Sequence, residues 1–175
     1  MISREIDHFI RDIEDFPKKG IKFKDITSLL LNSNLCTKIV SHTIAILDRK
    51  KIDAIAGIES RGFLFGFLLA NKLDLPFIPV RKSGKLPGET IKYSYDLEYG
   101  RSEIEIHKND ISKNWNVLVH DDLLATGGTA AAAAELINNL NANIYGFSFI
   151  IELSKLNGRN KLSKYSNNII TLKNY

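Results

Sequence analysis

Apolar residues along this chain recur at helical spacing in some segments and form short unbroken runs in others. Those at helical spacing between Ile2 and Ile13 predict a first amphipathic helix. Pro17 should end that helix, because the residue before a proline is pushed out of the helical region. A second helix is expected over residues 39–47, and a very apolar segment that ends at Leu73 is expected to form a buried helix.

Short apolar runs bounded by polar turns predict buried strands at residues 53–58, 77–80 and 117–119, and a last strand within 145–153. Strands that alternate with helices imply βαβ units and a mainly parallel sheet. Ligands bind such sheets at the carboxyl ends of the strands. We therefore expect a single α/β domain over residues 1–175, with a Rossmann-like, mainly parallel twisted sheet flanked by helices.

Residues 83–107 break this alternation. The stretch is rich in glycine and tyrosine, and Ile104 and Ile106 alternate with polar residues. The pattern predicts an antiparallel hairpin inserted between two core strands. Long inserted loops in α/β enzymes are often lids over the active site, although a surface hairpin without a catalytic role is the alternative.

The composition is ordinary for a globular protein, with 44% hydrophobic and 25% charged residues in a chain of 175. No apolar run is long enough to span a membrane. Cys36 stands alone, so we expect it to be packed rather than reactive, with no disulfide or zinc cluster, and a cytoplasmic enzyme is the default interpretation. The net charge of +4 comes from dispersed basic residues, so we expect small anionic substrates and neither nucleic acid nor membrane as a partner.

The run from Val117 to Leu140 carries the most chemistry. Its apolar start is followed by Asp121 and Asp122, then by a Gly-Gly loop, then by a helix-forming stretch from Ala130. The backbone N–H groups of such a loop and the helix N-terminus can hold a phosphate. Two adjacent carboxylates can accept hydrogen bonds from vicinal hydroxyls. A phosphate beside a diol describes a ribose 5-phosphate.

Two further turns are rich in cations. Ser60 and Arg61 follow the first predicted strand, and Arg81, Lys82 and Lys85 follow the second. Arginine suits bidentate contact with phosphate, so these turns fit a second anion, although each alone could be a solvated surface turn.

Together these runs resemble the type I phosphoribosyltransferases, and most closely the adenine-specific members of that family. The resemblance extends over nearly the whole chain and includes the segments 15–26, 56–66 and 80–88. It implies the type I phosphoribosyltransferase fold, a base-binding hood at residues 1–34 and a flexible flap at residues 83–107. The implied reaction is a purine salvage step, in which the 5-phosphoribosyl group of 5-phosphoribosyl-1-pyrophosphate (PRPP) passes to adenine and gives AMP and pyrophosphate.

The resemblance also implies a role for each candidate residue. Glu98 in the flap should accept the proton that adenine loses, since a carboxylate enclosed by a lid can have a raised pKa. Mg²⁺ should be held by PRPP and water, without direct protein ligands. The family completes its active site at a homodimer interface, so a homodimer is expected. The remaining contacts are expected with ribose 5-phosphate from Asp121, Asp122, Leu124, Ala125, Thr126, Gly127, Gly128 and Thr129, with pyrophosphate from Ser60, Arg61, Arg81, Lys82, Lys85 and Tyr99, and with adenine from Lys22, Phe23 and Lys24.

Two alternatives stay open at this point: a phosphoribosyltransferase for another base, and a non-catalytic regulator that senses PRPP or purines. A regulator would usually add a nucleic-acid-binding element, which the sequence does not suggest. Four residues depart from the family pattern: Glu59, where an aspartate is common, Phe67 after Gly66, Lys24 and His120. Lys24 replaces a common arginine, which weakens a bidentate role for that side chain but leaves a backbone contact possible. His120 replaces an apolar residue and is interpreted as facing solvent or a neighbour.

Overall fold

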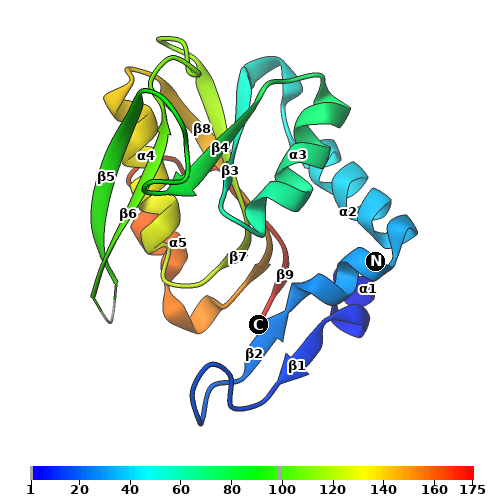
Figure 1. Ribbon diagram of the computed structural model, residues 1–175. Coiled ribbons are helices and arrows are strands. Elements are labelled where there is room, and N and C mark those ends of the chain that lie inside the picture. The colour runs from blue at the N-terminus through cyan, green and yellow to red at the C-terminus, as the bar shows by residue number, and fades with distance from the viewer. Residues whose placement is uncertain (1, 98–99) are drawn as a thin grey trace.

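A seven-stranded sheet with the spatial order β5-β6-β4-β3-β7-β8-β9 forms the centre of the molecule (Figure 1). The computed structural model describes residues 2–97 and 100–175. Neighbouring strands from β4 to β9 pair in parallel, whereas the β5–β6 hairpin joins β4 antiparallel. The strands are β3 (Ala54–Ile58), β4 (Phe77–Lys82), β5 (Thr90–Leu97), β6 (Gly100–His107), β7 (Asn116–Leu124), β8 (Asn143–Glu152) and β9 (Ile169–Asn174).

Helices cover both faces of this sheet and bury two apolar clusters. Successive side chains of a strand point to opposite faces, so Val117 and Val119 of β7 pack with α4, while Leu118 joins the cluster of α2 and α3. The α-helices of the described residues are α1 (Ile2–Phe9), α2 (Ser33–Ile46), α3 (Gly62–Leu73), α4 (Gly128–Asn139) and α5 (Gly158–Leu162). Short 3₁₀ helices are η1 (Ile26–Leu31), η2 (Arg49–Lys51) and η3 (Ser154–Leu156).

The order of the strands creates a crevice between β3 and β7. These two strands are neighbours, yet β3 leads through α3 to β4 on one side, whereas β7 leads through α4 to β8 on the other. The loops that leave their carboxyl ends therefore diverge to opposite faces of the sheet. Such a switch in strand order is where open α/β sheets bind ligands.

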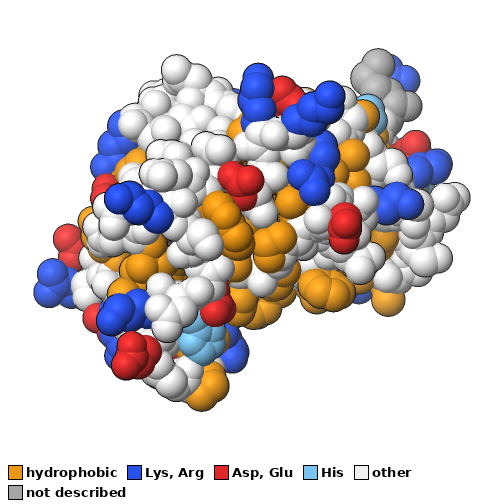
Figure 2. Space-filling model, turned by 90° about the horizontal axis from the view of Figure 1, so that it is seen from above, with side chains coloured by type: hydrophobic (Ala, Val, Ile, Leu, Met, Phe, Trp, Pro, Cys, Tyr) orange, Lys and Arg blue, Asp and Glu red, His pale blue; other side chains and the backbone are white. Residues whose placement is uncertain are grey.

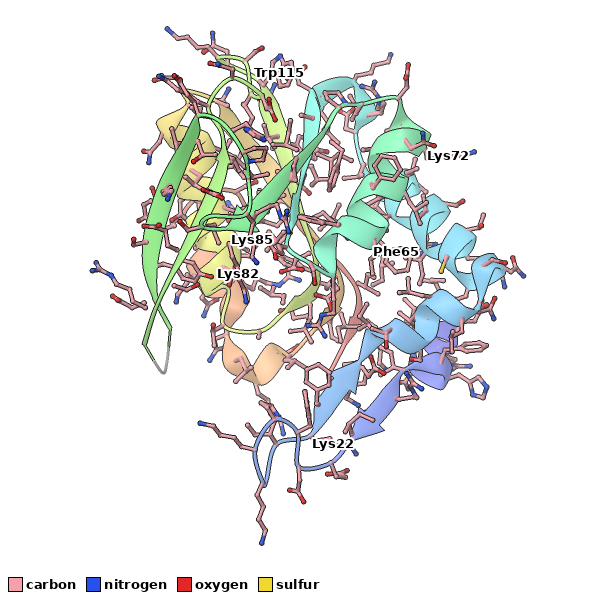
Figure 3. The ribbon with its side chains drawn as sticks, viewed as in Figure 1. Lys22, Phe65, Lys72, Lys82, Lys85 and Trp115 are labelled. Atoms are coloured by element: carbon pink, nitrogen blue, oxygen red, sulfur yellow. The ribbon has the colours of Figure 1, made fainter. Side chains whose placement is uncertain are left out.

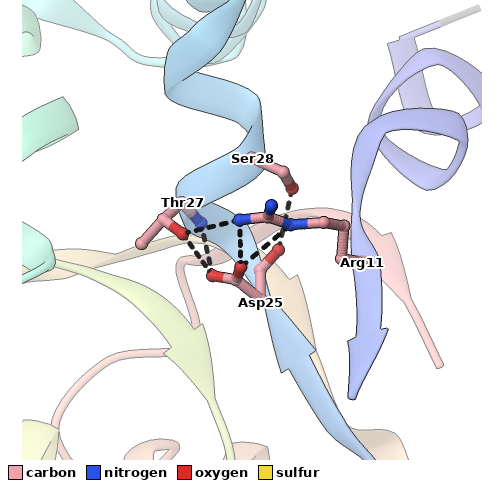
Figure 4. A network of polar contacts seen from close by, with 4 residues as sticks. All are labelled: Arg11, Asp25, Thr27 and Ser28. Atoms are coloured by element: carbon pink, nitrogen blue, oxygen red, sulfur yellow. Dashed lines mark hydrogen bonds and ion pairs between the residues drawn. The ribbon is translucent and has the colours of Figure 1, made fainter.

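A two-stranded ribbon, β1 (Arg11–Ile13) and β2 (Phe23–Asp25), stands apart from the sheet. Asp25 ties the ribbon to η1, because its carboxylate caps the turn at the Thr27 N–H, 2.9 Å away, and pairs with Arg11 Nη2 at 2.7 Å (Figure 4). The ribbon corrects one expectation: α1 ends at Phe9 rather than near Pro17. Ile13 fits the helical spacing but lies in an exposed strand.

The other expected helices and strands are confirmed, as is the antiparallel hairpin within residues 83–107. Three further details differ. β7 continues through both aspartates, and β9 adds a strand that was not expected. The helix α3 is only half buried, because Leu64, Phe67 and Leu68 are exposed. No helix in the described part of the chain is long and apolar enough to cross a membrane.

Candidate active site

The glycine loop (residues 125–129) joins β7 to α4 at the crevice. Gly127 precedes α4 with a φ of 76°, in the left-handed region that glycine adopts without strain, and no side chain caps the helix. The first N–H groups of α4 therefore remain available to an anion. Leu124 is buried in the core and also lines the small cavity over this loop.

Gly158, at the start of α5, supports the glycine loop from behind. A Cβ atom at this position would stand 2.2 Å from the Ala125 oxygen and 3.0 Å from the Gly127 nitrogen. Backbone therefore packs directly on backbone here. The sequence interpretation missed Gly158, because it lies about thirty residues downstream of the loop and carries no side chain that signals the contact.

Two cavities adjoin at the crevice. A small one of about 80 Å³ lies over the glycine loop, and a larger one of about 260 Å³ extends from it toward Glu59 and Lys82 on one side and the hairpin residue Tyr95 on the other. Asp121 and Thr129 line both cavities. An elongated ligand with a phosphate in the small cavity can therefore reach the ends of β3 and β4 through the large one.

The acidic pair lies at the wall between the glycine loop and Arg61. Asp122 Oδ2 stands 3.0 Å from Arg61 Nε, yet this buried oxygen accepts no hydrogen bond from the described residues. Burial and the facing charge of Asp122 raise the pKa of Asp121 well above its ordinary value. Burial acts on the pKa of Asp122 in the same direction, and Arg61 opposes it. A ligand hydroxyl that donates to Asp122 would satisfy an acceptor that is otherwise costly to bury.

Arg81 and Glu59 brace the loop that follows β4. Arg81 Nε lies 3.0 Å from Glu59 Oε2, and its Nη1 donates to the Lys85 carbonyl at 3.1 Å. Burial acts to raise the pKa of Glu59, but the Lys82 N–H and the Arg81 guanidinium bring it below its ordinary value. The exposed ammonium groups of Lys82 and Lys85 form no ion pair with a described residue and lie near one another (Figure 3).

Glu105 on β6 holds the same loop, and the sequence interpretation missed it. Its side chain is buried, and one carboxylate oxygen accepts the N–H groups of Lys85 and Leu86 at 2.8 and 2.9 Å. The other oxygen accepts from the Thr90 hydroxyl at 3.1 Å. The only signal in the sequence was an acidic residue between two buried isoleucines of a strand, which is an unusual place for a carboxylate.

The structure brings the hood to the same crevice. The ring of Phe23 on β2 lies 5.4 Å from the Arg61 guanidinium, so the expected base-binding aromatic adjoins the expected pyrophosphate-binding arginine. The ammonium groups of Lys22 and Lys24 instead pair with Asp12, at 2.9 and 2.6 Å. Lys22 lies at the far end of the ribbon (Figure 3). Neither lysine side chain is therefore free for a base.

The hairpin contacts the glycine loop through one hydrogen bond. The Tyr95 hydroxyl on β5 donates to Thr129 Oγ1 at 3.1 Å. Glu98 and Tyr99, the expected proton acceptor and its neighbour, lie outside the described residues. Tyr95 thus marks where the flap meets the candidate phosphate site.

His120 is buried between β7 and α3, which corrects the solvent-facing reading of this residue and leaves the neighbour-facing one. Its Nδ1 lies 3.3 Å from Ser148 Oγ, and burial lowers its pKa to about 3. The imidazole is therefore neutral at physiological pH. Among the described residues no group of three histidine, cysteine or acidic side chains could hold a metal ion.

Comparisons with known proteins agree with this geometry. The family model of the phosphoribosyl transferase domain matches residues 27–173. The chain is 50% identical over 157 residues to adenine phosphoribosyltransferase of Methanococcus vannielii, a match that covers 90% of this chain and 91% of the relative.

Two solved structures have the same architecture. Adenine phosphoribosyltransferase of Thermoanaerobacter pseudethanolicus superimposes with a TM-score of 0.95 at 46% identity and full coverage of both chains. The Saccharomyces cerevisiae enzyme, complexed with D-2,5-dideoxy-2,5-imino-altritol 1,6-bisphosphate and adenine, gives 0.92 at 43% identity and 98% coverage of both chains. This chain therefore belongs to the adenine phosphoribosyltransferases, a purine salvage branch of the type I phosphoribosyltransferase family.

Proposed function

We propose that the chain transfers the 5-phosphoribosyl group of PRPP to adenine, with release of pyrophosphate and formation of AMP, through the residues of the crevice between β3 and β7. The observation that carries this proposal is that Asp121 lines the cavity over the glycine loop, while the next residue, Asp122, has a buried oxygen that accepts no hydrogen bond from the described residues. One element suits a phosphate and the other suits a ribose hydroxyl, so together they fit a phosphoribosyl group.

In this proposal the glycine loop binds the 5-phosphate through its N–H groups and the hydroxyls of Thr126 and Thr129. Asp121 and Asp122 accept hydrogen bonds from the ribose hydroxyls. Cleavage of the bond between C1′ and pyrophosphate leaves positive charge on the ribose ring, and the aspartates place negative charge beside it. Charges that are already oriented before the reaction stabilise such a transition state without reorganisation.

Pyrophosphate would leave toward the cations at the ends of β3 and β4. Lys82 lines the large cavity, and Ser60, Arg61 and Lys85 are the further groups that we assign to pyrophosphate. Arg61 pairs with Asp122 and Arg81 with Glu59, so both guanidinium groups are also held by a carboxylate. Mg²⁺ bound to the phosphates would neutralise part of the leaving-group charge. Asp121 and Asp122 belong to no cluster of three candidate metal ligands among the described residues. A metal carried by the substrate and water fits this donor set.

Adenine would bind between the hood and the crevice. Phe23 supplies an aromatic face, and backbone groups of residues 22–24 read the edge of the base, because both lysine side chains are held by Asp12. Glu98 would accept the proton from the imidazole ring of adenine as the flap closes, with Tyr99 as a positioning group.

The exposed side of α3 supports the homodimer in this proposal. Leu64, Phe67 and Leu68 are 41%, 57% and 41% exposed, and a groove of about 330 Å³ lies between α3 and Phe77. Figure 2 shows hydrophobic side chains gathered on one face of the molecule. An apolar surface of this kind on a helix needs a partner. The cytoplasmic location stays a prediction.

A single assay tests the proposed function. The protein is incubated with PRPP and Mg²⁺ and, separately, with adenine, hypoxanthine, guanine or orotate, and pyrophosphate release is measured. We expect release with adenine alone and its loss after chelation of Mg²⁺. Equal activity with another base would refute the specificity, and no release with any base would favour the regulator.

A further inference from the structure

Tyr175 lies where the hood meets the central sheet. Its backbone is fixed to the sheet, because its N–H donates to the Glu152 carbonyl at 2.8 Å and its carbonyl accepts from the Ser154 N–H at 3.0 Å. Figure 1 shows this end of the chain, beyond β9, beside β2 and α1. Tyr175 is thus anchored in one part of the molecule and directed toward the other.

The side chain of Tyr175 contacts the hood at two points. Lys24 Nζ lies 3.9 Å from the centre of its ring, and its hydroxyl donates to Asp7 Oδ1 on α1 at 2.8 Å. Lys173 reinforces the contact from the sheet side, with its Nζ 4.9 Å from the ring centre and 3.2 Å from Asp7 Oδ2. Burial and the Asp7 carboxylate raise the pKa of the Tyr175 hydroxyl, so it remains a donor at neutral pH.

Lys24 is committed to this contact. Its ammonium group also pairs with Asp12 at 2.6 Å, and only 15% of its side chain is exposed. A lysine held between a carboxylate and an aromatic ring has little freedom to turn toward a ligand. Tyr175 therefore contacts β2 through Lys24, one residue from Phe23.

We propose that Tyr175 is a positioning residue for the adenine subsite: it holds Lys24 and thereby fixes the backbone of β2 that reads the base. The inference rests on the proposed function, because it takes the hood as the adenine-binding element. In this proposal the side chain of Lys24 binds Tyr175 and Asp12, and adenine is bound by the backbone of β2. We also expect Tyr175 to affect adenine and PRPP differently, since the glycine loop and the acidic pair make no contact with it.

The test is steady-state kinetics with each substrate varied in turn. Tyr175→Leu should raise KM for adenine about tenfold, the loss that corresponds to one partly buried cation–π contact with Lys24. KM for PRPP should stay within about twofold. Tyr175→Phe keeps the ring and should retain most of the affinity for adenine. Tyr165→Phe, a tyrosine on the α4 side of the sheet, is the matched control and should leave both constants unchanged.

Lys24→Met provides an independent arm. If Tyr175 acts through Lys24, Lys24→Met should reproduce the effect of Tyr175→Leu, and the double variant should be no worse than either single one. If Tyr175→Leu fails to fold, Lys24→Met and Tyr175→Phe still test whether Tyr175 positions the adenine subsite. Equal changes in the two KM values, or a lowered melting temperature with unchanged KM values, would overturn the inference. Failure of the wild-type protein to use adenine would instead refute the proposed function.

Discussion

Replacing Gly158 with alanine should damage the phosphate site from behind without touching any ligand. The φ of Gly158 is not in the left-handed region, so an alanine backbone fits there and only the contact excludes it. The new Cβ would stand 2.2 Å from the Ala125 oxygen and 2.8 Å from Leu124 Cδ1. Since carbon and oxygen need more than about 3 Å, the Ala125 carbonyl must move by about 1 Å.

That displacement sets the expected magnitude. Overpacking of this kind costs about 1–3 kcal/mol of stability. A shift of about 1 Å in a positioning element can lower a rate about 100-fold. We therefore expect kcat/KM for PRPP to fall about 100-fold, while KM for adenine at saturating PRPP changes little, because the hood makes no contact with Gly158. Pyrophosphate release measured over a range of each substrate gives both constants.

Gly146→Ala is the matched control for this prediction. A Cβ at Gly146 on β8 would stand 2.4 Å from the Asn168 oxygen, a comparable clash that involves no part of the glycine loop. It should lower the melting temperature by a similar amount and leave kcat/KM for PRPP unchanged. If Gly158→Ala keeps its kcat/KM for PRPP, or if kcat/KM falls equally in both variants, the supporting role of Gly158 is wrong.

Four further predictions concern the acidic pair, the flap, the buried histidine and the exposed side of α3. Asp122→Asn keeps the shape of the side chain but removes its charge, so kcat/KM should fall about 100-fold, and an unchanged value would contradict the ribose role. Glu98→Gln should lower kcat by about 10² to 10⁴ with PRPP affinity intact; an equal loss of PRPP binding would make it a structural flap residue. His120, neutral in the fold with a pKa of about 3, takes up a proton on unfolding below about pH 6.5. This proton uptake should contribute a loss of stability of up to about 1.4 kcal/mol per pH unit as the pH drops below that value, and His120→Leu should remove that contribution; the same pH dependence of unfolding in the variant would rule this out. Sedimentation should give a homodimer that Phe67→Glu dissociates, and a fully active wild-type monomer would argue against it.

Most of the sheet and the helices on its faces could be predicted, because buried strands and amphipathic helices leave a periodic pattern. The pattern of apolar residues did not reveal two strands, one with no buried side chains and one with side chains buried on a single face. The ribbon strand β1 is exposed throughout, so Ile13 carried no signal of a strand and extended the helical spacing instead. The edge strand β9 is short, and only alternate residues of it are buried, so it was overlooked.

The candidate site could be predicted where its residues are close together in the sequence. The glycine loop and the acidic pair follow one strand directly, so their spacing along the chain fixes their spacing in space. Glu105, Gly158 and Tyr175 were missed because each contacts a segment far from it in the sequence: the loop after β4, the glycine loop and the hood, respectively. Their contributions depend on which strands are neighbours, and that order is decided by the packing of the whole sheet.

The separation of the hood from the central sheet has a consequence for how this enzyme can change over evolutionary time. The crevice that we propose for the sugar and its phosphates is built from loops of the sheet, and substitutions there would impair transfer to any base. The ribbon β1–β2 forms its own small sheet and meets the rest through side chains such as Tyr175. If the ribbon binds the base as proposed, substitutions within it can change base preference while the loops that contact the phosphoribosyl group stay the same.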